Sequence, residues 1–333
     1  MNRLDSIKLQ FPDTCVDSLH VGSFKHVQTT DTQGNTSQVH RLDQFVPYGL
    51  KECRLSEGVC TLELSAKVLQ GQYFEGISRD TALSAIAACS NHGISFDPEK
   101  VLDSAILFKA DTTLNVALPG AGMKPTLIAL QTLRPKAYIP ERYKGESVVF
   151  RPLHKTSNKY YRQTFYDKQA ELNKHKADMA LLPVHDFLDT IRYEVNLKTF
   201  AQLRVAAGTG DRIGPVHLHE LLYSDTCMNL IAFQQLLHDK DAQPYLFTEF
   251  SDDADMKDIV HMIGIRGICI ECNLDPDLID CLLRKHTDSR RTYTRWKTEV
   301  FAVLRDLQAQ VTLSTSDDLL AELHENMIQA GAA

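Results

Sequence analysis

Apolar and polar residues alternate along much of the first two hundred positions, and this two-residue period is typical of strands with one buried face. The clearest example is the segment 191–198, where Ile191, Tyr193, Val195 and Leu197 alternate with polar residues. The segments that show this pattern are 59–66, 105–118, 147–153, 159–167 and 191–198. We predict a strand in each of them.

A helical spacing of apolar residues separates some of these strands and dominates after about Phe200. Ser78 can cap a helix over 78–91, and Gly93 can end it. The other helical segments are 123–133, 168–179, 217–238, 253–264, 275–286, 290–309 and 315–329. We therefore predict an α+β fold, with a mainly antiparallel sheet, flanking helices and a helical C-terminal region. The expected division is a sheet-based domain, 1–205, and a mostly helical region, 206–333.

The composition is that of an average globular protein, with 43% hydrophobic and 24% charged residues in a chain of 333. This excludes disordered and collagen-like chains. The N-terminus lacks the apolar run of a signal peptide, and no stretch approaches the ~18 apolar residues of a membrane helix. We expect the protein to stay in the cytosol of the cell that makes it, without a membrane partner. Eight cysteines are too few for a disulfide scaffold and are expected to be reduced.

Positive charge is concentrated in two segments of a chain whose net charge is −7. Segment 141–163 has six cations against two acids and contains three tyrosines, and segment 284–297 has six cations against one acid, with Tyr293 and Trp296. The net charge argues against nucleic acid binding over the whole surface. Cations beside aromatic rings suit single-stranded nucleic acid, and the alternative is two solvated faces.

Three of the predicted strands carry a reactive side chain on the polar face: Asp111, Tyr166 and Glu194. In 105–118 the opposite, apolar face holds Ile106 and Phe108. Neighbouring strands lie ~4.8 Å apart, so polar groups on adjacent strands can converge. Two carboxylates suit a hard cation such as Mg²⁺, and a tyrosine beside it could attack phosphorus. The alternative is the ordinary polar face of a half-exposed sheet.

A tyrosine with a pKa near 10 becomes a nucleophile only when a base or a cation stabilises its phenolate. Lys168, Arg162 and the expected metal are the candidates for this role. Other tyrosines, Tyr160 and Tyr161, could be alternative nucleophiles or stacking platforms, or they could pack in the sheet.

The segment SAKVLQGQYFEG (65–76) resembles the SPAKVLQGHNVFG motif of the gene II replication initiators of filamentous bacteriophages. Later elements of that family also match in order, and the resemblance extends over roughly 55–310. The matching segments are KADTT (109–113), FYDK through Glu171 (165–171), RYE through Lys198 (192–198) and TYTRWKTEVFAVLRDL (292–307). Gln72 and Tyr73 replace the family's His-Asn, Ser65 replaces its proline, and Lys109 replaces an arginine.

This resemblance implies an enzyme of rolling-circle phage replication that nicks origin DNA and later rejoins the strand. Tyr166 would become joined to the 5′ phosphate, with Lys168 and Arg192 as further catalytic residues. Asp111 and Glu194 would bind Mg²⁺ or Mn²⁺. The residues expected to contact DNA are Lys67, Gln70, Arg162, Lys198, Arg291, Arg295 and Lys297.

The expected partners are phage origin DNA, duplex and single-stranded, and host replication proteins such as helicase and polymerase, in the cytoplasm of a bacterial host. A non-catalytic DNA-binding regulator of phage replication is the alternative. Gly71 could serve the DNA contacts of Lys67 and Gln70, or it could allow a turn with positive φ.

Two further motifs allow metal sites. His217 and His219 could bind a metal if they lay on a strand, but the context favours a helix start. Cys269 and Cys272, with Cys281 and His286 downstream, could bind zinc, although apolar neighbours favour buried structural cysteines. Trp296 could anchor a helix core or bring its basic neighbours to DNA.

Overall fold

The computed structural model describes most of the chain. The positions outside its described residues are 1, 21, 23, 31–35, 43–48, 119–121, 134, 144–146, 155–157, 175–180, 211, 239–255, 273–274, 288, 312–315 and 333.

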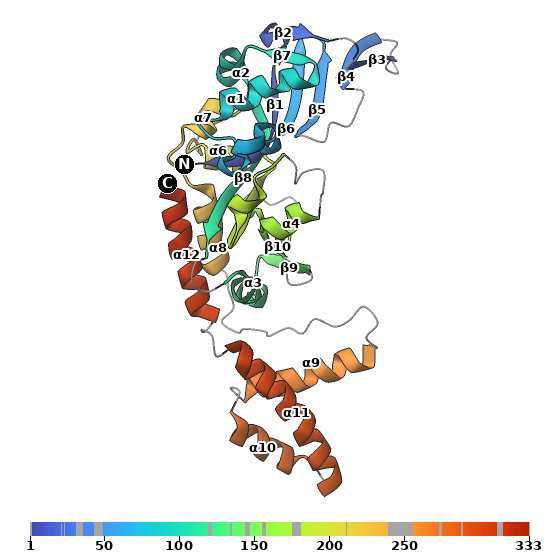
Figure 1. The fold of residues 1–333 in the computed structure, drawn as a ribbon, viewed down its shortest axis with the longest axis vertical. Coiled ribbons are helices and arrows are strands. Elements are labelled where there is room, and N and C mark those ends of the chain that lie inside the picture. The colour runs from blue at the N-terminus through green and yellow to red at the C-terminus, as the bar shows by residue number, and fades with distance from the viewer. Residues whose placement is uncertain are drawn as a thin grey trace.

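A ten-stranded antiparallel sheet forms the centre of the molecule, in the order β3-β4-β5-β6-β1-β8-β12-β11-β10-β9 (Figure 1). Its strands are β1 (Arg3–Pro12), β3 (Phe24–Thr30), β4 (Thr36–Leu42), β5 (Leu50–Ser56), β6 (Val59–Ser65), β8 (Ile106–Ala117), β9 (Tyr138–Tyr143), β10 (Ser147–Pro152), β11 (Arg162–Asp167) and β12 (Thr190–Leu197). A separate pair joins β2 (Val16–Leu19) to β7 (Ile94–Phe96). The α+β class with a mainly antiparallel sheet is confirmed.

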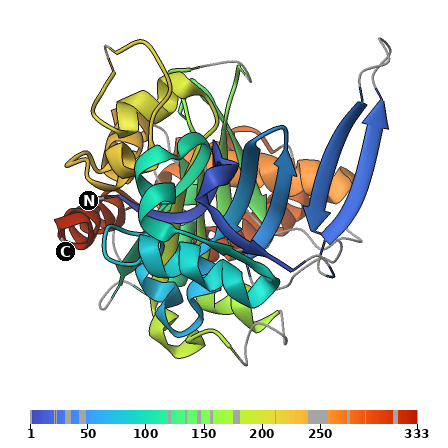
Figure 2. The same ribbon diagram turned by 90° about the horizontal axis from the view of Figure 1, so that it is seen from above.

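All five predicted strands are present, as β6, β8, β10, β11 and β12. β11 begins at Arg162, three residues later than expected. The central strand β1 was not predicted, because its apolar residues do not alternate cleanly: a register shift between Leu4 and Ser6 marks a bulge. β3 and β4 form the outer edge of the sheet, where Figure 2 shows them extending away from the remaining strands.

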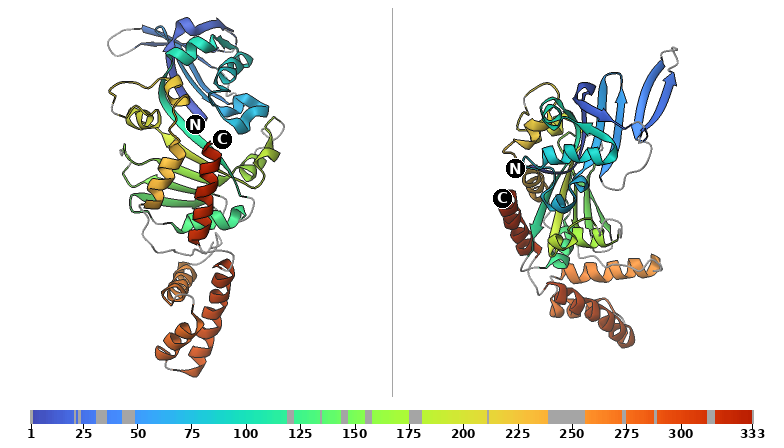
Figure 3. Two further views of the ribbon diagram at one scale, coloured as in Figure 1. Left: turned by 90° about the vertical axis from the view of Figure 1, so that its left-hand side faces the viewer. Right: turned by 45° about the horizontal axis from the view of Figure 1, so that its top comes forward.

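Helices cover one face of the sheet. The helices on this face are α3 (Met123–Thr132), α8 (Met228–His238) and α12 (Ser316–Ala332), which pack on β8, β10, β11 and β12. The left view in Figure 3 shows α8 and α12 crossing these strands. Phe233 of α8 packs against the rings of Phe165 and Tyr193, so these apolar strand residues point into the core. The polar residues between them therefore face the opposite side of the sheet.

Shorter helices surround the sheet. They are α1 (Ala82–Ala87), α2 (Pro98–Ser104), α4 (Lys168–Asn173), α6 (Phe200–Ala206), α7 (Leu218–Leu222) and the 3₁₀ helices η1 (Asp13–Cys15), η3 (Ala66–Glu75), η4 (Ala88–His92) and η5 (Val184–Phe187). The segment predicted as one helix near 217–238 is two helices, α7 and α8. Residues 175–180, the end of the helix predicted at 168–179, lie outside the described residues. No helix among the described residues has the length and apolar character needed to span a bilayer.

The buried apolar residues form two cores. The larger core includes residues of α7, α8 and α12 as well as the sheet. The smaller core holds α9 (Met256–Glu271), α10 (Pro276–Lys285) and α11 (Arg290–Val311) together, through residues such as Ile265, Ile279 and Leu304. The division expected at 205/206 does not follow these two cores, because α12 returns to the sheet and packs on α3, α8 and β8.

Candidate functional site

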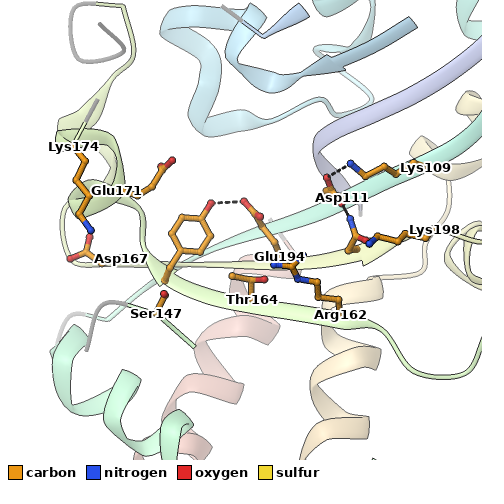
Figure 4. A pocket seen from close by; sticks show the side chains of 12 residues that line it. Lys109, Asp111, Ser147, Arg162, Thr164, Asp167, Glu171, Lys174, Glu194 and Lys198 are labelled. Atoms are coloured by element: carbon orange, nitrogen blue, oxygen red, sulfur yellow. Dashed lines mark hydrogen bonds and ion pairs between the residues drawn. The ribbon is translucent and has the colours of Figure 1, made fainter. Parts of the chain in front are cut away.

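The face of the sheet opposite α8 holds a pocket of about 500 Å³ across β8, β12 and β11 (Figure 4). Its lining residues are Lys109, Asp111, Ser147, Arg162, Thr164, Tyr166, Asp167, Glu171, Lys174, Glu194, Asn196 and Lys198. The strand register explains why they meet. Asp111 lies opposite Asn196, and Glu194 lies between Thr113 of β8 and Thr164 of β11. Asp111, Tyr166 and Glu194 are therefore brought into one pocket, as strand alternation predicted.

The phenol of Tyr166 lies between the carboxylate of Glu194 and the ammonium of Lys168. Its Oη donates a hydrogen bond to Glu194 Oε1 at 2.5 Å and accepts one from Lys168 Nζ at 3.2 Å. Lys168 is the first residue of α4, which Asp167 caps by accepting a hydrogen bond from the backbone N–H of Ala170 at 2.8 Å. The side chain of Lys168 is 4% exposed and also pairs with Glu171 at 2.7 Å. The helix cap therefore holds a desolvated ammonium against the phenol.

Arg192 has a different place from the one expected. Its side chain is fully buried, with Nη2 donating to Asp5 Oδ1 at 2.5 Å and Nε donating to Glu194 Oε1 at 3.2 Å. The guanidinium also lies 5.0 Å from the ring centre of Tyr73. A phosphate in the pocket cannot reach this buried guanidinium, so the direct catalytic contact expected of Arg192 is not possible, and its side chain instead pairs with Asp5 and Glu194.

Asp5 and Tyr73 complete this network, and strand alternation did not identify either residue. Tyr73 donates a hydrogen bond from its hydroxyl to Asp5 Oδ1 at 3.1 Å and is itself buried. Asp5 lies at the bulge of β1, between Leu4 and Ser6. No pattern in the sequence marks a bulge of this kind, because it depends on the pairing of β1 with β8. Tyr73 stands where the initiator motif has asparagine.

The buried charges alter the acidity of the site. Burial raises the pKa of Tyr166, and the charge of Glu194 raises it further. Burial also raises the pKa of Glu194, and Asp5 adds to the effect while Arg192 and Lys168 oppose it. For Asp5, burial favours a higher pKa, but the positive charges of Arg192, Lys168 and Lys51 outweigh it and lower the pKa. Asp5 therefore carries the charge that balances Arg192, and Glu194 is the more basic carboxylate.

The oxygen atoms beside Asp111 suit a hard cation. Asp111 accepts hydrogen bonds from Ser6 Oγ and Asn196 Nδ2, and Lys109 Nζ lies 3.4 Å from its Oδ2. Thr113 Oγ1 and Asn196 Oδ1 are buried and have no hydrogen-bond partner. Within the described residues no three His, Cys, Asp or Glu side chains converge on one point. A cation here would therefore use Asp111 and Glu194 together with uncharged oxygens, which Mg²⁺ accepts.

Two cations at the rim of the pocket are not neutralised. The side chains of Arg162 and Lys198 are exposed, and no partner for either is found among the described residues. Lys109, in contrast, pairs with Glu63 at 3.5 Å as well as with Asp111. Figure 4 shows Lys109 and Lys198 extending to one side of the pocket and Lys174 lying at the other. Arg162 and Lys198 are the side chains most available to an anion.

The AKVLQG segment folds as η3 beside β1. Val68 and Leu69 are buried, whereas Lys67 is half-buried and Gln70 is exposed. The residue with positive φ is Gln70, at 48°, and not Gly71, so the turn suggested for Gly71 is wrong. Further along η3, Tyr73 reaches the network of Asp5 and Arg192.

The second basic segment, 284–297, spans the end of α10 and the start of α11. Arg291 and Arg295 are exposed. Lys297 instead pairs with Asp280 at 2.5 Å, and Arg284 pairs with the same carboxylate at 2.7 Å. The expected contact of Lys297 with DNA therefore competes with an ion pair between α10 and α11.

The first basic segment, 141–163, does not form one patch. Arg151 pairs with Glu141 across the hairpin of β9 and β10, whereas Arg162 lies in the pocket. Residues 144–146 and 155–157 lie outside the described residues. Tyr161 is buried, and Tyr160 packs edge-on against Tyr138 with ring centres 5.6 Å apart. Packing is therefore the observed role of both tyrosines.

The two alternative metal motifs lie outside the pocket. His217 is the N-cap of α7 and its backbone N–H is bonded to Glu220 at 2.8 Å, which confirms the helix start. The rings of His217 and His219 stack with centres 5.7 Å apart.

The cysteine motif belongs to the smaller core. Cys269 is buried there, whereas Cys281 and His286 are exposed. Trp296 packs against the same core. The packing roles of Cys269 and Trp296 are therefore observed.

Comparison with known proteins found no family model and no curated protein that matches the chain.

Proposed function

We propose that the protein is a DNA strand-nicking and joining enzyme that initiates rolling-circle replication of a phage, with Tyr166 as the nucleophile. The observation that carries this proposal is the phenol held between Glu194 at 2.5 Å and Lys168 at 3.2 Å, in a pocket lined by two cations, Arg162 and Lys198, for which the described residues supply no partner. Because the pKa of Tyr166 is raised, the phenol has to lose its proton during the attack; Glu194 can accept that proton, and the ammonium of Lys168 lies against the phenol oxygen. The resemblance to the gene II initiators supports the same assignment.

In the proposed reaction, Tyr166 Oη attacks a backbone phosphorus and its proton passes to Glu194. A bond forms between the phenol oxygen and phosphorus, and the bond from phosphorus to the 3′ oxygen breaks. The leaving 3′ oxygen takes a proton from water and becomes the 3′ hydroxyl. Lys168 stabilises the phenolate as it forms. The phosphotyrosine bond conserves the energy of the broken bond, so rejoining is the reverse attack by a 3′ hydroxyl.

Magnesium or manganese is the proposed cofactor, with Asp111 and Glu194 as its charged ligands and Thr113 Oγ1 and Asn196 Oδ1 as neutral ones. The unpartnered state of these two buried oxygens supports the choice. A bound cation would supply neutralising charge to the scissile phosphate.

The metal ligands predict the behaviour of two variants. Asp111→Asn and Glu194→Gln should each lower the nicking rate at least about 100-fold while DNA is still retained in a gel shift. Each change removes a charged ligand but keeps the size of the side chain. The exposed Asp103→Asn is the control and should nick normally. Full nicking by Asp111→Asn would remove that residue from the metal site.

The proposed DNA contacts come from separate surfaces. Arg162 and Lys198 would bind phosphates that flank the scissile one, because they are exposed and lack partners among the described residues. Lys67 and Gln70 of η3, and Arg291 and Arg295 of α11, are proposed to contact duplex DNA at the origin. The proposed setting is the cytoplasm of a bacterial host, where host helicase and polymerase would extend the freed 3′ end.

The role of Glu194 as proton acceptor predicts a pH dependence. Glu194 must be ionised to accept the proton, so kcat/KM should fall as the pH is lowered through the pKa of Glu194, which burial raises and which a bound cation would lower. The charge of Asp5 contributes to this rise. Asp5→Asn should therefore move the acid limb to lower pH, as measured by nicking rates across a pH series. Asp17→Asn, at an exposed position of β2, should leave it in place. An acid limb unmoved by Asp5→Asn would contradict the proton-acceptor role.

Covalent labelling tests the proposed function directly. Protein incubated with Mg²⁺ and radioactively labelled supercoiled phage DNA should yield open circles and labelled protein, and mass spectrometry should find the nucleotide on the peptide that contains Tyr166. The alternative, a DNA-binding regulator, keeps the basic surfaces but forms no covalent link. Binding without labelling would favour the regulator.

A further inference from the structure

Two exposed aromatic rings are close in the chain to cations that line the pocket. Phe108 of β8 and Phe200 of α6 are 37% and 39% exposed, and their rings meet edge to face with centres 5.4 Å apart. Each is close in sequence to a cation that lines the pocket: Phe108 precedes Lys109, and Phe200 follows Lys198 by two residues. Figure 4 shows Lys109 and Lys198 extending to the same side of the pocket.

A bulge in β8 produces this exposure. Strand alternation predicted that Phe108 would share the apolar face with Ile106. In the structure, Lys8 of β1 pairs with Lys109 and Leu9 pairs with Leu107, so Phe108 is an extra residue without its own partner in β1. Leu107 is fully buried in place of Phe108. The bulge therefore exposes a large apolar ring at the residue that precedes Lys109.

We propose that Phe108 and Phe200 form a stacking platform for an unpaired nucleobase of the DNA strand whose phosphate enters the pocket. This proposal rests on the proposed function and deepens it. Exposed aromatic rings bind the faces of bases, and neighbouring cations bind the phosphates that connect them. Arg162 of β11 and Lys198, the residue that follows β12, supply that charge in the pocket that also holds Tyr166.

The arrangement also specifies the state of the substrate. A base can stack on Phe108 and Phe200 only after it has left its own helical stack, so the strand must be single or locally melted at this position. The strand would cross the sheet from β11 over β12 to β8, with its scissile phosphate at Tyr166 and the stacked base beyond Lys198. A bound duplex cannot offer such a base without opening.

Binding of short oligonucleotides tests the platform. Fluorescence anisotropy without added metal would compare a labelled single-stranded oligonucleotide with its duplex form. Phe108→Leu and Phe200→Leu should each lower the single-strand affinity about tenfold and leave the duplex affinity unchanged, because leucine keeps apolar packing but cannot stack. Tyr223→Leu, which changes a 51% exposed aromatic residue on the C-terminal side of α7, is the matched control and should change neither affinity. Thermal unfolding would confirm that the variants are folded.

An abasic oligonucleotide sharpens the test. Removing the base that stacks should lower the affinity of the wild type for the single strand about tenfold, as the leucine variants do. Phe108→Leu should then bind the abasic strand no more weakly than the wild type does. Equal losses for single strand and duplex would overturn the platform, since backbone contacts alone would explain them. Unchanged single-strand affinity in both leucine variants, or a change in self-association without a change in DNA affinity, would overturn it as well. Failure of the wild type to bind DNA or to become labelled would instead reject the proposed function.

Discussion

Replacing Tyr166 with phenylalanine should abolish the covalent protein–DNA adduct and lower nicking at least about 10³-fold, to the level of the uncatalysed background. The change removes one oxygen atom. That oxygen is the only atom of the side chain that can bond to phosphorus, and it is the atom held by Glu194 and Lys168. The ring itself fits the same half-buried space, so DNA binding should be retained. The measurements are conversion of supercoiled DNA to open circles and transfer of label to the protein.

Tyr143→Phe is a matched control for this variant. Tyr143 lies on β9, is 52% exposed, and donates a hydrogen bond from its hydroxyl to Glu141 at 3.2 Å. It therefore has a carboxylate partner like Tyr166 but does not line the pocket. Loss of the Tyr143 hydroxyl should leave nicking and labelling unchanged. If Tyr166→Phe is still labelled, the nucleophile is another residue and the assignment of Tyr166 is wrong.

Replacing Arg192 with methionine should lower the free energy of unfolding by about 3–5 kcal/mol. The guanidinium is fully buried, and its removal leaves Asp5 and Glu194 without their shared cation. Methionine fills much of the same volume, so the expected loss comes mainly from the buried charges and not from a cavity. Urea unfolding of the wild type and the variant would measure it. Arg162→Met, at an exposed arginine, should change stability by no more than about 0.5 kcal/mol.

The loss of unfolding free energy in Arg192→Met should depend on pH. The pKa of Asp5 in the folded protein is below its ordinary value of 3.8, so its ionisation stabilises the fold above pH 3.8. This stabilisation is lost as the pH falls through the folded-state pKa. The difference in unfolding free energy between wild type and Arg192→Met should therefore become smaller at acid pH. A difference that is absent at neutral pH would show that Arg192 does not neutralise a buried charge.

The faces of individual strands were predictable because the side chains of a strand alternate by geometry. The polar residues of 191–198 alternate with apolar ones that pack under α8, and this placed Glu194 on the accessible face before any contact was known. The same reasoning placed Asp111 and Tyr166. Their convergence required β8, β12 and β11 to be neighbours, which the sequence allowed but did not demand.

Bulges and contacts with other segments explain why strand alternation misplaced two other side chains, Phe108 and Arg192. Alternation placed Phe108 in the core, and the register shift against β1 brought it to the surface. Alternation also placed Arg192 on the polar face, and Tyr73 and Phe187 then covered that position. The strand that displaces Phe108 and the ring of Tyr73 that covers Arg192 both come from distant parts of the chain, whereas Phe187 is near Arg192 in the sequence.

The sequence by itself determined the α+β class, the strand faces and the polar character of Asp111, Tyr166 and Glu194, because these follow from the local period of the chain. The tertiary structure alone decided that Asp5 joins Arg192, that Lys297 binds Asp280, and that α12 packs on the sheet instead of on α9–α11. These are pairings between separate elements of the fold. Their free energy depends on which groups become buried together, and a local pattern carries no information about the partner.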